Sequence, residues 1–164
     1  EAVLPLDSIS QPLAMANTRA RLRMATLYAV AQANSCLVAG TGNKVEDFGV
    51  GFFTKYGDGG VDLSPIADLF KTQVFKLGSH LNVVNSILAA KPTDGLWEDG
   101  RSDEDQLGAT YTELEWAMDF KGDRNTLSGR QLEVLTIYEQ FHRVNRHKMI
   151  PIPVCLIPDE YKNS

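Results

Sequence analysis

The sequence predicts an α/β domain in which helices flank an open parallel sheet. Residues 35–42, SCLVAGTG, form a short apolar run that ends in a Gly-Thr-Gly turn, which is typical of a buried parallel strand. Amphipathic stretches with helix-capping residues precede and follow this run. The chain has 164 residues, of which 43% are hydrophobic, so we expect residues 1–164 to form a single domain with a sizeable core.

Composition excludes several classes of protein. A net charge of −5 is not typical of a nucleic-acid-binding domain, and no apolar run approaches the length of a membrane span. The cysteines, Cys36 and Cys155, are far apart, which suits a reducing compartment, and Cys36 is predicted to be a small buried hydrophobe. We therefore predict a cytoplasmic protein that binds neither nucleic acid nor membranes. CxxC, HExxH and GxxxxGK[ST] motifs do not occur, which argues against a zinc site and a P-loop.

The first predicted helix covers about residues 18–33. Residues 1–15 are expected to be irregular, and Asn17 is a plausible N-cap. The second half of this helix is apolar on nearly every side, which predicts that it is buried. Arg21 lies on an apolar row of the helix, so it requires a partner, either an internal carboxylate or a bound anion.

The segment after the predicted strand is where a ligand would bind. Ligands of open α/β sheets lie beyond the carboxyl ends of the strands. Thr41, Asn43 and Glu46 supply a hydroxyl, an amide and a carboxylate there. These residues alone are weak evidence, because turns commonly contain Asn and Thr.

A second helix is predicted to begin at Ser64, with Pro65 in its first position, and to end at Gly78. Lys71 lies just off its apolar face, and on this helix alone a solvated surface lysine is the ordinary interpretation. A further helix is expected over about residues 79–89.

The second half of the chain begins with an acidic loop at residues 94–105, either a mobile lid or a solvated loop. Thr112 and Glu115 have the spacing of a capping box for a short helix near residues 113–120. Ser128 is predicted to cap a long amphipathic helix that ends at about residue 146. Its expected buried residues are Leu132, Leu135, Ile137, Phe141 and Val144.

Basic residues gather at the end of this last helix. They are His142, Arg143, Arg146, His147 and Lys148. Cations at a helix C-terminus are favourable without any ligand, and an anion-binding site is the alternative.

Five segments in order resemble the NAD synthetases, adenylate-forming amide ligases of the ATP-pyrophosphatase group. They are NTRARLRM (17–24), GTGNKVE (40–46), GFFTKYGDGGVDLSPIADLFK (51–71), KPTDGLW (91–97) and SDEDQLGATYTELE (102–115). The resemblance runs from about residue 17 to residue 120, with a further match at residues 147–148. It implies a Rossmann-like sheet of the adenine nucleotide alpha hydrolase type, typically in a homodimer.

The resemblance implies NAD biosynthesis by ATP-dependent amidation of deamido-NAD. The nicotinate carboxylate attacks the α-phosphate of ATP and pyrophosphate leaves, and ammonia then displaces AMP from the acyl-adenylate. Both steps build negative charge on oxygens, which fixed cations, Mg²⁺ and hydrogen-bond donors stabilise. Ammonia from solution and ammonia from a glutaminase domain or chain are both open.

The resemblance also implies roles for individual residues. Thr41, Lys71 and Thr93 match ATP contacts, and Glu46 matches a Mg²⁺ ligand. Lys71 would also offset charge as pyrophosphate departs. The implied contacts to deamido-NAD are Arg21, Lys55, Asp62, His147 and Lys148.

The glycine-rich stretch GFFTKYGDGG, residues 51–60, carries the second implied catalytic residue. Asp58 resembles the acidic residue that receives ammonium and takes its proton, because protonated ammonia has no free lone pair for attack. The glycines are expected to let the backbone approach the dinucleotide closely.

One family feature does not occur in these residues. The family's ATP-pyrophosphatase loop, SGGxDS, holds the ATP pyrophosphate and supplies a second Mg²⁺ ligand, whereas residues 6–10, LDSIS, lack its glycines. The match is thus to the C-terminal two-thirds of the synthetase domain, with a sheet incomplete at its N-terminal side. We expect the segment to belong to a longer protein and to be inactive alone.

Two other interpretations are open. One is an ATP-pyrophosphatase relative that amidates or thiolates a different substrate, against which Lys55, Asp58 and Asp62 argue. The other is a non-catalytic module that assembles with a partner chain.

Overall fold

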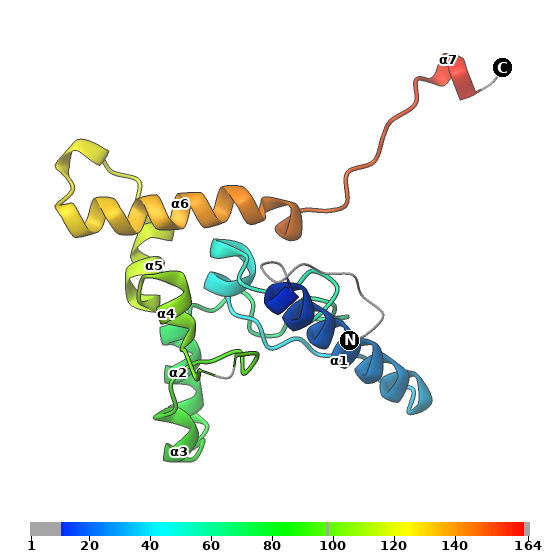
Figure 1. Ribbon diagram of the computed structural model, residues 1–164, viewed down its shortest axis with the longest axis horizontal. Coiled ribbons are helices and arrows are strands. Elements are labelled where there is room, and N and C mark those ends of the chain that lie inside the picture. Colours follow the sequence, from blue (N-terminus) through cyan, green and yellow to red (C-terminus); the bar gives the residue numbers. More distant parts are fainter. Residues whose placement is uncertain (1–10, 98, 163–164) are drawn as a thin grey trace.

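The structure is a computed structural model that describes residues 11–97 and 99–162. The elements in chain order are α1 (Gln11–Ala33), the π-helix η1 (Val45–Val50), α2 (Lys71–His80), α3 (Asn85–Leu88), α4 (Asp103–Leu107), α5 (Tyr111–Asp119), the 3-10 helix η2 (Arg124–Thr126), α6 (Gly129–Met149) and α7 (Asp159–Lys162). In Figure 1, α5 lies against α6, α2 and α3 lie together, and the chain after α6 runs away from the body to α7. None of the helices in these described ranges is long and apolar enough to cross a bilayer.

The core lies where η1, α5 and α6 meet. Leu114, Val45 and Val50 are fully buried there. Gly49 permits the close approach, because a Cβ atom at this position would lie 2.6 Å from the sulfur of Met118 on α5. This packing holds η1, and Glu46 within it, beside the first turn of α5.

The parallel strand predicted at residues 35–42 does not form in the described part of the chain. A single isolated parallel bridge joins Ala39 to Leu63, with a hydrogen bond of 2.8 Å from the Gly40 amide to the Leu63 carbonyl. A sheet requires several consecutive backbone pairings, and the described residues form a single bridge between these two segments. The expected open sheet is therefore wrong for these residues, and Cys36 is exposed rather than buried.

Helix α1 already includes Gln11, the first described residue, so the predicted start at Asn17 is wrong and residues 11–15 are helical. Residues 1–10 lie outside the described ranges. Asn17 instead accepts a hydrogen bond of 2.7 Å from the Thr54 hydroxyl. Ala16 and Ala20 are buried because their small side chains let the glycine-rich loop at residues 51–60 pack closely against the helix.

The second half of α1 is mostly exposed, contrary to the prediction from its apolar sequence. Leu22, Leu27 and Val30 are 63%, 56% and 56% exposed. Apolar periodicity predicts which faces can be buried, but the described residues place nothing over these side chains.

Helix α2 begins at Lys71, whereas Ser64 and Pro65 were the predicted start. Residues 65–69 form turns instead. The Phe70 amide donates to the side-chain oxygen of Gln73 at 2.8 Å and so closes the N-terminus that Ser64 was expected to cap. The later start places Lys71 in the first helical position rather than on the flank of a longer helix.

The predicted boundaries after this point are partly wrong. Helix α2 continues past Gly78 and ends at His80. The helix expected over residues 79–89 is replaced by the end of α2 and the short α3. Helix α4 lies at the end of the predicted acidic loop, where Ser102 caps it by accepting from the Asp105 amide.

The capping box of α5 uses different residues from those predicted. Thr110 and Glu113 form it, with the Thr110 amide 2.9 Å from a Glu113 carboxylate oxygen. Glu115 instead accepts hydrogen bonds from the amide and the hydroxyl of Thr72, at 2.9 Å and 2.7 Å, and ties α5 to α2.

Ser128 begins α6 as predicted, and its amide donates to Gln131 at 3.0 Å. The helix ends at Met149, slightly later than expected. Leu135 is buried, whereas Leu132 and Val144 are 39% and 60% exposed, so the predicted buried side is only partly correct.

Candidate active site

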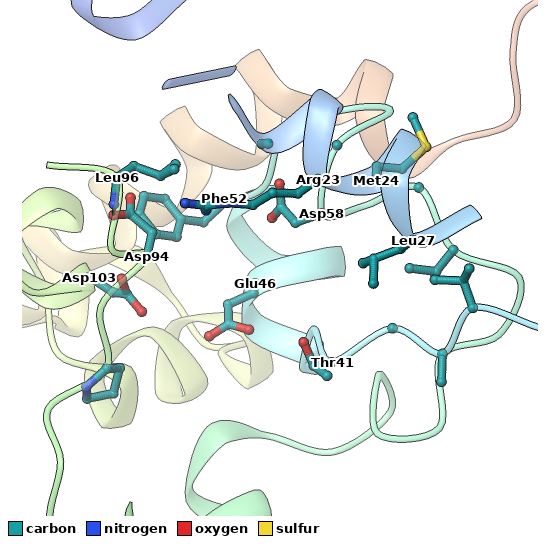
Figure 2. A pocket seen from close by; sticks show the side chains of 18 of the residues that line it. Arg23, Met24, Leu27, Thr41, Glu46, Phe52, Asp58, Asp94, Leu96 and Asp103 are labelled. Carbon is teal, nitrogen blue, oxygen red and sulfur yellow. Dashed lines mark hydrogen bonds between the residues drawn. The ribbon is translucent and has the colours of Figure 1, made fainter. Parts of the chain in front are cut away.

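Five of the residues selected from the sequence line one cavity of about 520 Å³. They are Thr41, Glu46, Asp58, Lys71 and Thr93. They come from five separate segments: the turn after the bridge, η1, the glycine-rich loop, the start of α2 and the loop before α4. Figure 2 shows the Glu46 carboxylate in the open space between Thr41 and Asp103.

Glu46 projects into the cavity because Asn43 fixes the start of η1. The Asn43 side-chain oxygen accepts from the amides of Val45 and Glu46, at 3.0 Å and 3.2 Å. Asn43 is only 1% exposed, so its amide serves this turn rather than a ligand. Thr41, by contrast, is exposed and lines the cavity.

An ion pair between Lys71 and Glu46 lies at the centre of the site. Lys71 Nζ is 2.9 Å from Glu46 Oε1, and the two side chains are 20% and 16% exposed. Lys71 also lies 4.9 Å from the centroid of the Tyr111 ring. Lys71 is therefore a half-buried, paired cation and not the solvated surface lysine that its helix alone suggested.

Tyr111 and Asp103 belong to the same cluster, although neither was predicted from the sequence to be a site residue. The Tyr111 hydroxyl is 2.6 Å from Glu46 Oε1 and 3.1 Å from Asp103 Oδ2. Burial is the main reason that the pKa of Asp103 is raised, and burial with the nearby Glu46 raises the pKa of Tyr111. Both residues lie in segment 102–115, one of the five that resemble the NAD synthetases. Capping and acidic residues alternate there, and this pattern did not distinguish them as site residues.

Asp103 has one oxygen without a partner. The residue is 6% exposed, and Oδ1 receives no hydrogen bond from the residues that the structure describes, although Oδ2 contacts Tyr111. Buried carboxylate oxygens are normally satisfied, so this atom has capacity for a donor from outside the chain. Asp94 lines the same cavity, which gives this end of it an acidic lining.

The residues are compatible with a single-carboxylate contact to Mg²⁺. Across residues 11–97 and 99–162, His, Cys, Asp and Glu side chains do not converge in threes around a point that could hold an ion. Protein Mg²⁺ sites commonly use one or two carboxylates and complete the shell with water and substrate phosphates. Glu46 fits that pattern, since it is a half-buried carboxylate that faces the cavity.

Asp58 lies where three cavities meet. It lines the main cavity and two smaller ones, of about 170 Å³ and 230 Å³, that Lys148 also lines. Asp58 Oδ1 accepts from the Thr54 amide at 2.9 Å, which fixes the carboxylate within its loop. Asp47 is nearby, and burial, then repulsion from Glu46 and Asp58, raises its pKa to about 6.

Gly57 and Gly60 line the main cavity, and the close approach of their backbone to the dinucleotide stays a prediction. A Cβ atom at Gly57 would lie 3.0 Å from Ala20 Cβ, and one at Gly59 would lie 2.3 Å from the Phe53 ring. The space beside these glycines is thus filled by the chain's own side chains.

The remaining predicted contacts lie outside the main cavity. Lys55 Nζ donates to the His147 carbonyl at 2.6 Å, and Arg21 Nε donates to the Lys55 carbonyl at 3.3 Å. Arg21 is exposed. The partner of its guanidinium is thus a backbone oxygen, and not the internal carboxylate that was one of the two alternatives. Lys148 Nζ donates to the carbonyls of Gly51 and Phe53, at 2.9 Å and 2.8 Å, and burial lowers its pKa.

Asp62 joins the segments of the bridge. Its carboxylate accepts from the Val38 amide at 2.8 Å and from the Tyr28 hydroxyl at 3.1 Å. It does not line the main cavity, so its predicted contact with deamido-NAD stays a prediction.

Comparison with known proteins identifies the family. The family model described as NAD synthase matches residues 5–150. The chain belongs to the NAD synthase family. Its relatives include the "NH(3)-dependent NAD(+) synthetase" of Alkaliphilus metalliredigens, 43% identical over 85% of this chain and 53% of the relative. The protein of the same name from Syntrophomonas wolfei is 39% identical over 99% of this chain and 62% of the relative.

Solved structures of the family share the fold. The NMN synthetase from Francisella tularensis is 38% identical, with a TM-score of 0.76 over 90% of this chain and 57% of that one. The NH3-dependent NAD synthetase from Campylobacter jejuni is 22% identical, and its TM-score of 0.68 over 95% of this chain shows likeness of fold alone. The chain therefore belongs to a Rossmann-like fold, although its described residues form no strand. The chain spans 53–62% of the two curated relatives above.

Proposed function

We propose that the protein containing this chain is an ammonia-dependent NAD synthetase, which amidates deamido-NAD to NAD and converts ATP to AMP and pyrophosphate. The observation that supports it most is the convergence of Thr41, Glu46, Asp58, Lys71 and Thr93 around one cavity. The names of the relatives favour ammonia over glutamine as the nitrogen source.

In the proposed first step the nicotinate carboxylate forms a bond to the α-phosphorus of ATP, and the bond to pyrophosphate breaks. Lys71 would stabilise the charge that develops on the leaving phosphate oxygens, and Thr41 and Thr93 would orient the nucleotide. Mg²⁺, when bound, would neutralise phosphate charge, and Glu46 is the residue that would hold it.

In the second step ammonia attacks the acyl carbon of the adenylate, and AMP leaves. Asp58 would attract ammonium and accept a proton from it, because ammonium must lose that proton before it can attack. Its position at the junction of three cavities supports this role, because a small cation can approach it from a side that the larger substrate does not fill. Lys55, Arg21, Asp62, His147 and Lys148 remain proposed contacts to deamido-NAD.

The test is NAD formation by the protein as its gene encodes it, with deamido-NAD, ATP, Mg²⁺ and ammonium. Lys71→Met should lower kcat by about 100-fold or more, because a fixed cation in the site is lost. Lys76→Met, on the exposed part of the same helix, is the matched control and should leave kcat unchanged. Equal effects of the two substitutions, or full activity of Lys71→Met, would contradict the assignment.

A second substrate has a specific observation behind it. The Francisella protein that shares the fold at 38% identity is called an NMN synthetase. The corresponding candidate here is amidation of the mononucleotide that lacks the adenylate half of deamido-NAD. Comparing kcat/KM for the two substrates decides between them, and a higher value for deamido-NAD is the expected result.

We also propose that the protein assembles as a homodimer. Leu22, Leu27 and Val30 on α1 support this, because clusters of exposed large apolar side chains are commonly covered by association. Light scattering of the natural protein should give twice the mass of its chain.

A further inference from the structure

The hydroxyl of Tyr111 has no assigned role in the proposed reaction, yet it contacts the residue proposed to hold Mg²⁺. Tyr111 is 4% exposed, and its ring belongs to the core formed by η1, α5 and α6. Its hydroxyl reaches the cluster of charged groups, where it lies 2.6 Å from Glu46 Oε1 and 3.1 Å from Asp103 Oδ2. That distance is typical of a hydroxyl that donates to an ionised carboxylate.

The two oxygens of Glu46 are occupied unequally. Among the described residues, Oε1 accepts from both Lys71 Nζ, at 2.9 Å, and the Tyr111 hydroxyl, whereas Oε2 accepts only from the Asn43 backbone amide, at 3.2 Å. Each carboxylate oxygen has about two lone-pair positions. Oε1 is therefore saturated, and Oε2 is the oxygen with spare capacity.

We propose that Tyr111 is a positioning residue that, together with Lys71, saturates Glu46 Oε1 and so keeps Oε2 available for a divalent cation. This inference rests on the proposed function, because it takes Glu46 as the residue that holds Mg²⁺. Without the hydroxyl, Oε1 has a free lone pair and the carboxylate can turn to share both oxygens with Lys71. A cation must then compete with the lysine for the same atoms.

Tyr111→Phe isolates the hydroxyl. The phenylalanine ring keeps both the core packing and the contact with the Lys71 ammonium, which needs only the ring face. Tyr138→Phe is the matched control, because Tyr138 is a partly buried tyrosine that packs against the same core but does not line the cavity. Thermal melting of each variant establishes that it is folded, and a fall of a few degrees is expected for Tyr111→Phe.

The measurement is Mn²⁺ binding to the natural protein, followed by electron paramagnetic resonance without turnover. Tyr111→Phe should weaken binding by about tenfold, the usual lower limit for loss of a group that orients a metal ligand. Tyr138→Phe should bind as the unsubstituted protein does. In a Glu46→Gln background, Tyr111→Phe should cause no further loss, because the hydroxyl acts through that carboxylate.

The outcomes separate this inference from the proposed function. Normal Mn²⁺ binding by Tyr111→Phe, with binding lost in Glu46→Gln, overturns the positioning role and leaves the metal assignment intact. Normal binding by Glu46→Gln overturns both the assignment and the inference. Formation of NAD from deamido-NAD, measured separately, tests the proposed activity whichever result is obtained.

Discussion

Asp47 lies near two other carboxylates, those of Glu46 and Asp58, and its ionisation should destabilise the folded protein. Its pKa is raised from 3.8 to about 6, first by burial and then by repulsion from Glu46 and Asp58. The folded protein thus holds this proton more tightly than the unfolded chain does. The free energy of unfolding must therefore fall as the pH rises from about 4 through about 6.

Asp47→Asn should remove this penalty. The variant should be more stable than the unsubstituted protein by about 1 kcal/mol at pH 7, a value kept small because Asp47 is partly exposed and water screens the repulsion. The gain should shrink as the pH falls and vanish below about pH 3, where the carboxyl is protonated in both states. Urea denaturation at several pH values measures it. Asp68→Asn, at a surface carboxylate that is 97% exposed, is the control for the same substitution at a site away from Glu46 and Asp58.

The residues of the candidate site were predictable only in part. Glu46, Lys71 and Asp58 lie in stretches whose order in the chain resembles the family, so sequence was sufficient to select them. Tyr111 and Asp103 were missed because their role arises from contacts across the fold. Tyr111 is 65 positions from Glu46 in the chain, and no local pattern records that pairing.

At the scale of elements, Gly51 follows η1 and begins the glycine-rich loop. Its backbone is in the left-handed conformation, which is strained for residues other than glycine. Its φ is +64°, and a Cβ atom there would lie 2.5 Å from Asn145 Cβ on α6. Gly51→Ala should therefore lower the free energy of unfolding by at least about 2 kcal/mol, from backbone strain and overpacking together.

Gly129→Ala is the control for this prediction. It lies at the first position of α6, with no atom within 4 Å of an added Cβ, so alanine should be neutral or slightly stabilising. Urea denaturation of both variants provides the comparison. Equal stabilities would show that α6 can move away from the loop without cost.

Elements defined by local chemistry were the easiest to predict. Ser128 begins α6 because a cap and its partner lie within one turn, and sequence contains all of that information. The strand predicted at residues 35–42 does not form because a strand needs a run of paired neighbours, and the described residues offer only the single bridge between Ala39 and Leu63. Ser64 and Pro65 have the chemistry of a helix start, yet the bridge beside them and the Gln73 cap move the start to Lys71.

At the scale of the whole molecule, the 164 residues are expected to lack a complete ATP site. No SGGxDS motif occurs in them, and the described residues supply Lys71 and Glu46 but no glycine loop of that type beside the cavity. We predict that this chain alone forms NAD at less than about 1% of the rate of the natural protein, since several phosphate contacts are missing together. Chromatography of the product at equal protein concentrations measures it. Comparable rates would overturn the prediction.

The single bridge between residues 39 and 63 has a consequence for local stability. The amides of Val38, Gly40 and Asp62 are each bonded across this junction, through Asp62 Oδ2, the Leu63 carbonyl and the Val38 carbonyl. Because so few bonds hold it, separation of the two segments exposes all three amides at once. Deuterium should therefore enter them together, and sooner than the amides of buried α5 residues such as Leu114. Thr41 follows the junction directly and lines the cavity proposed to bind ATP, so we expect that wall of the cavity to loosen when the bridge opens.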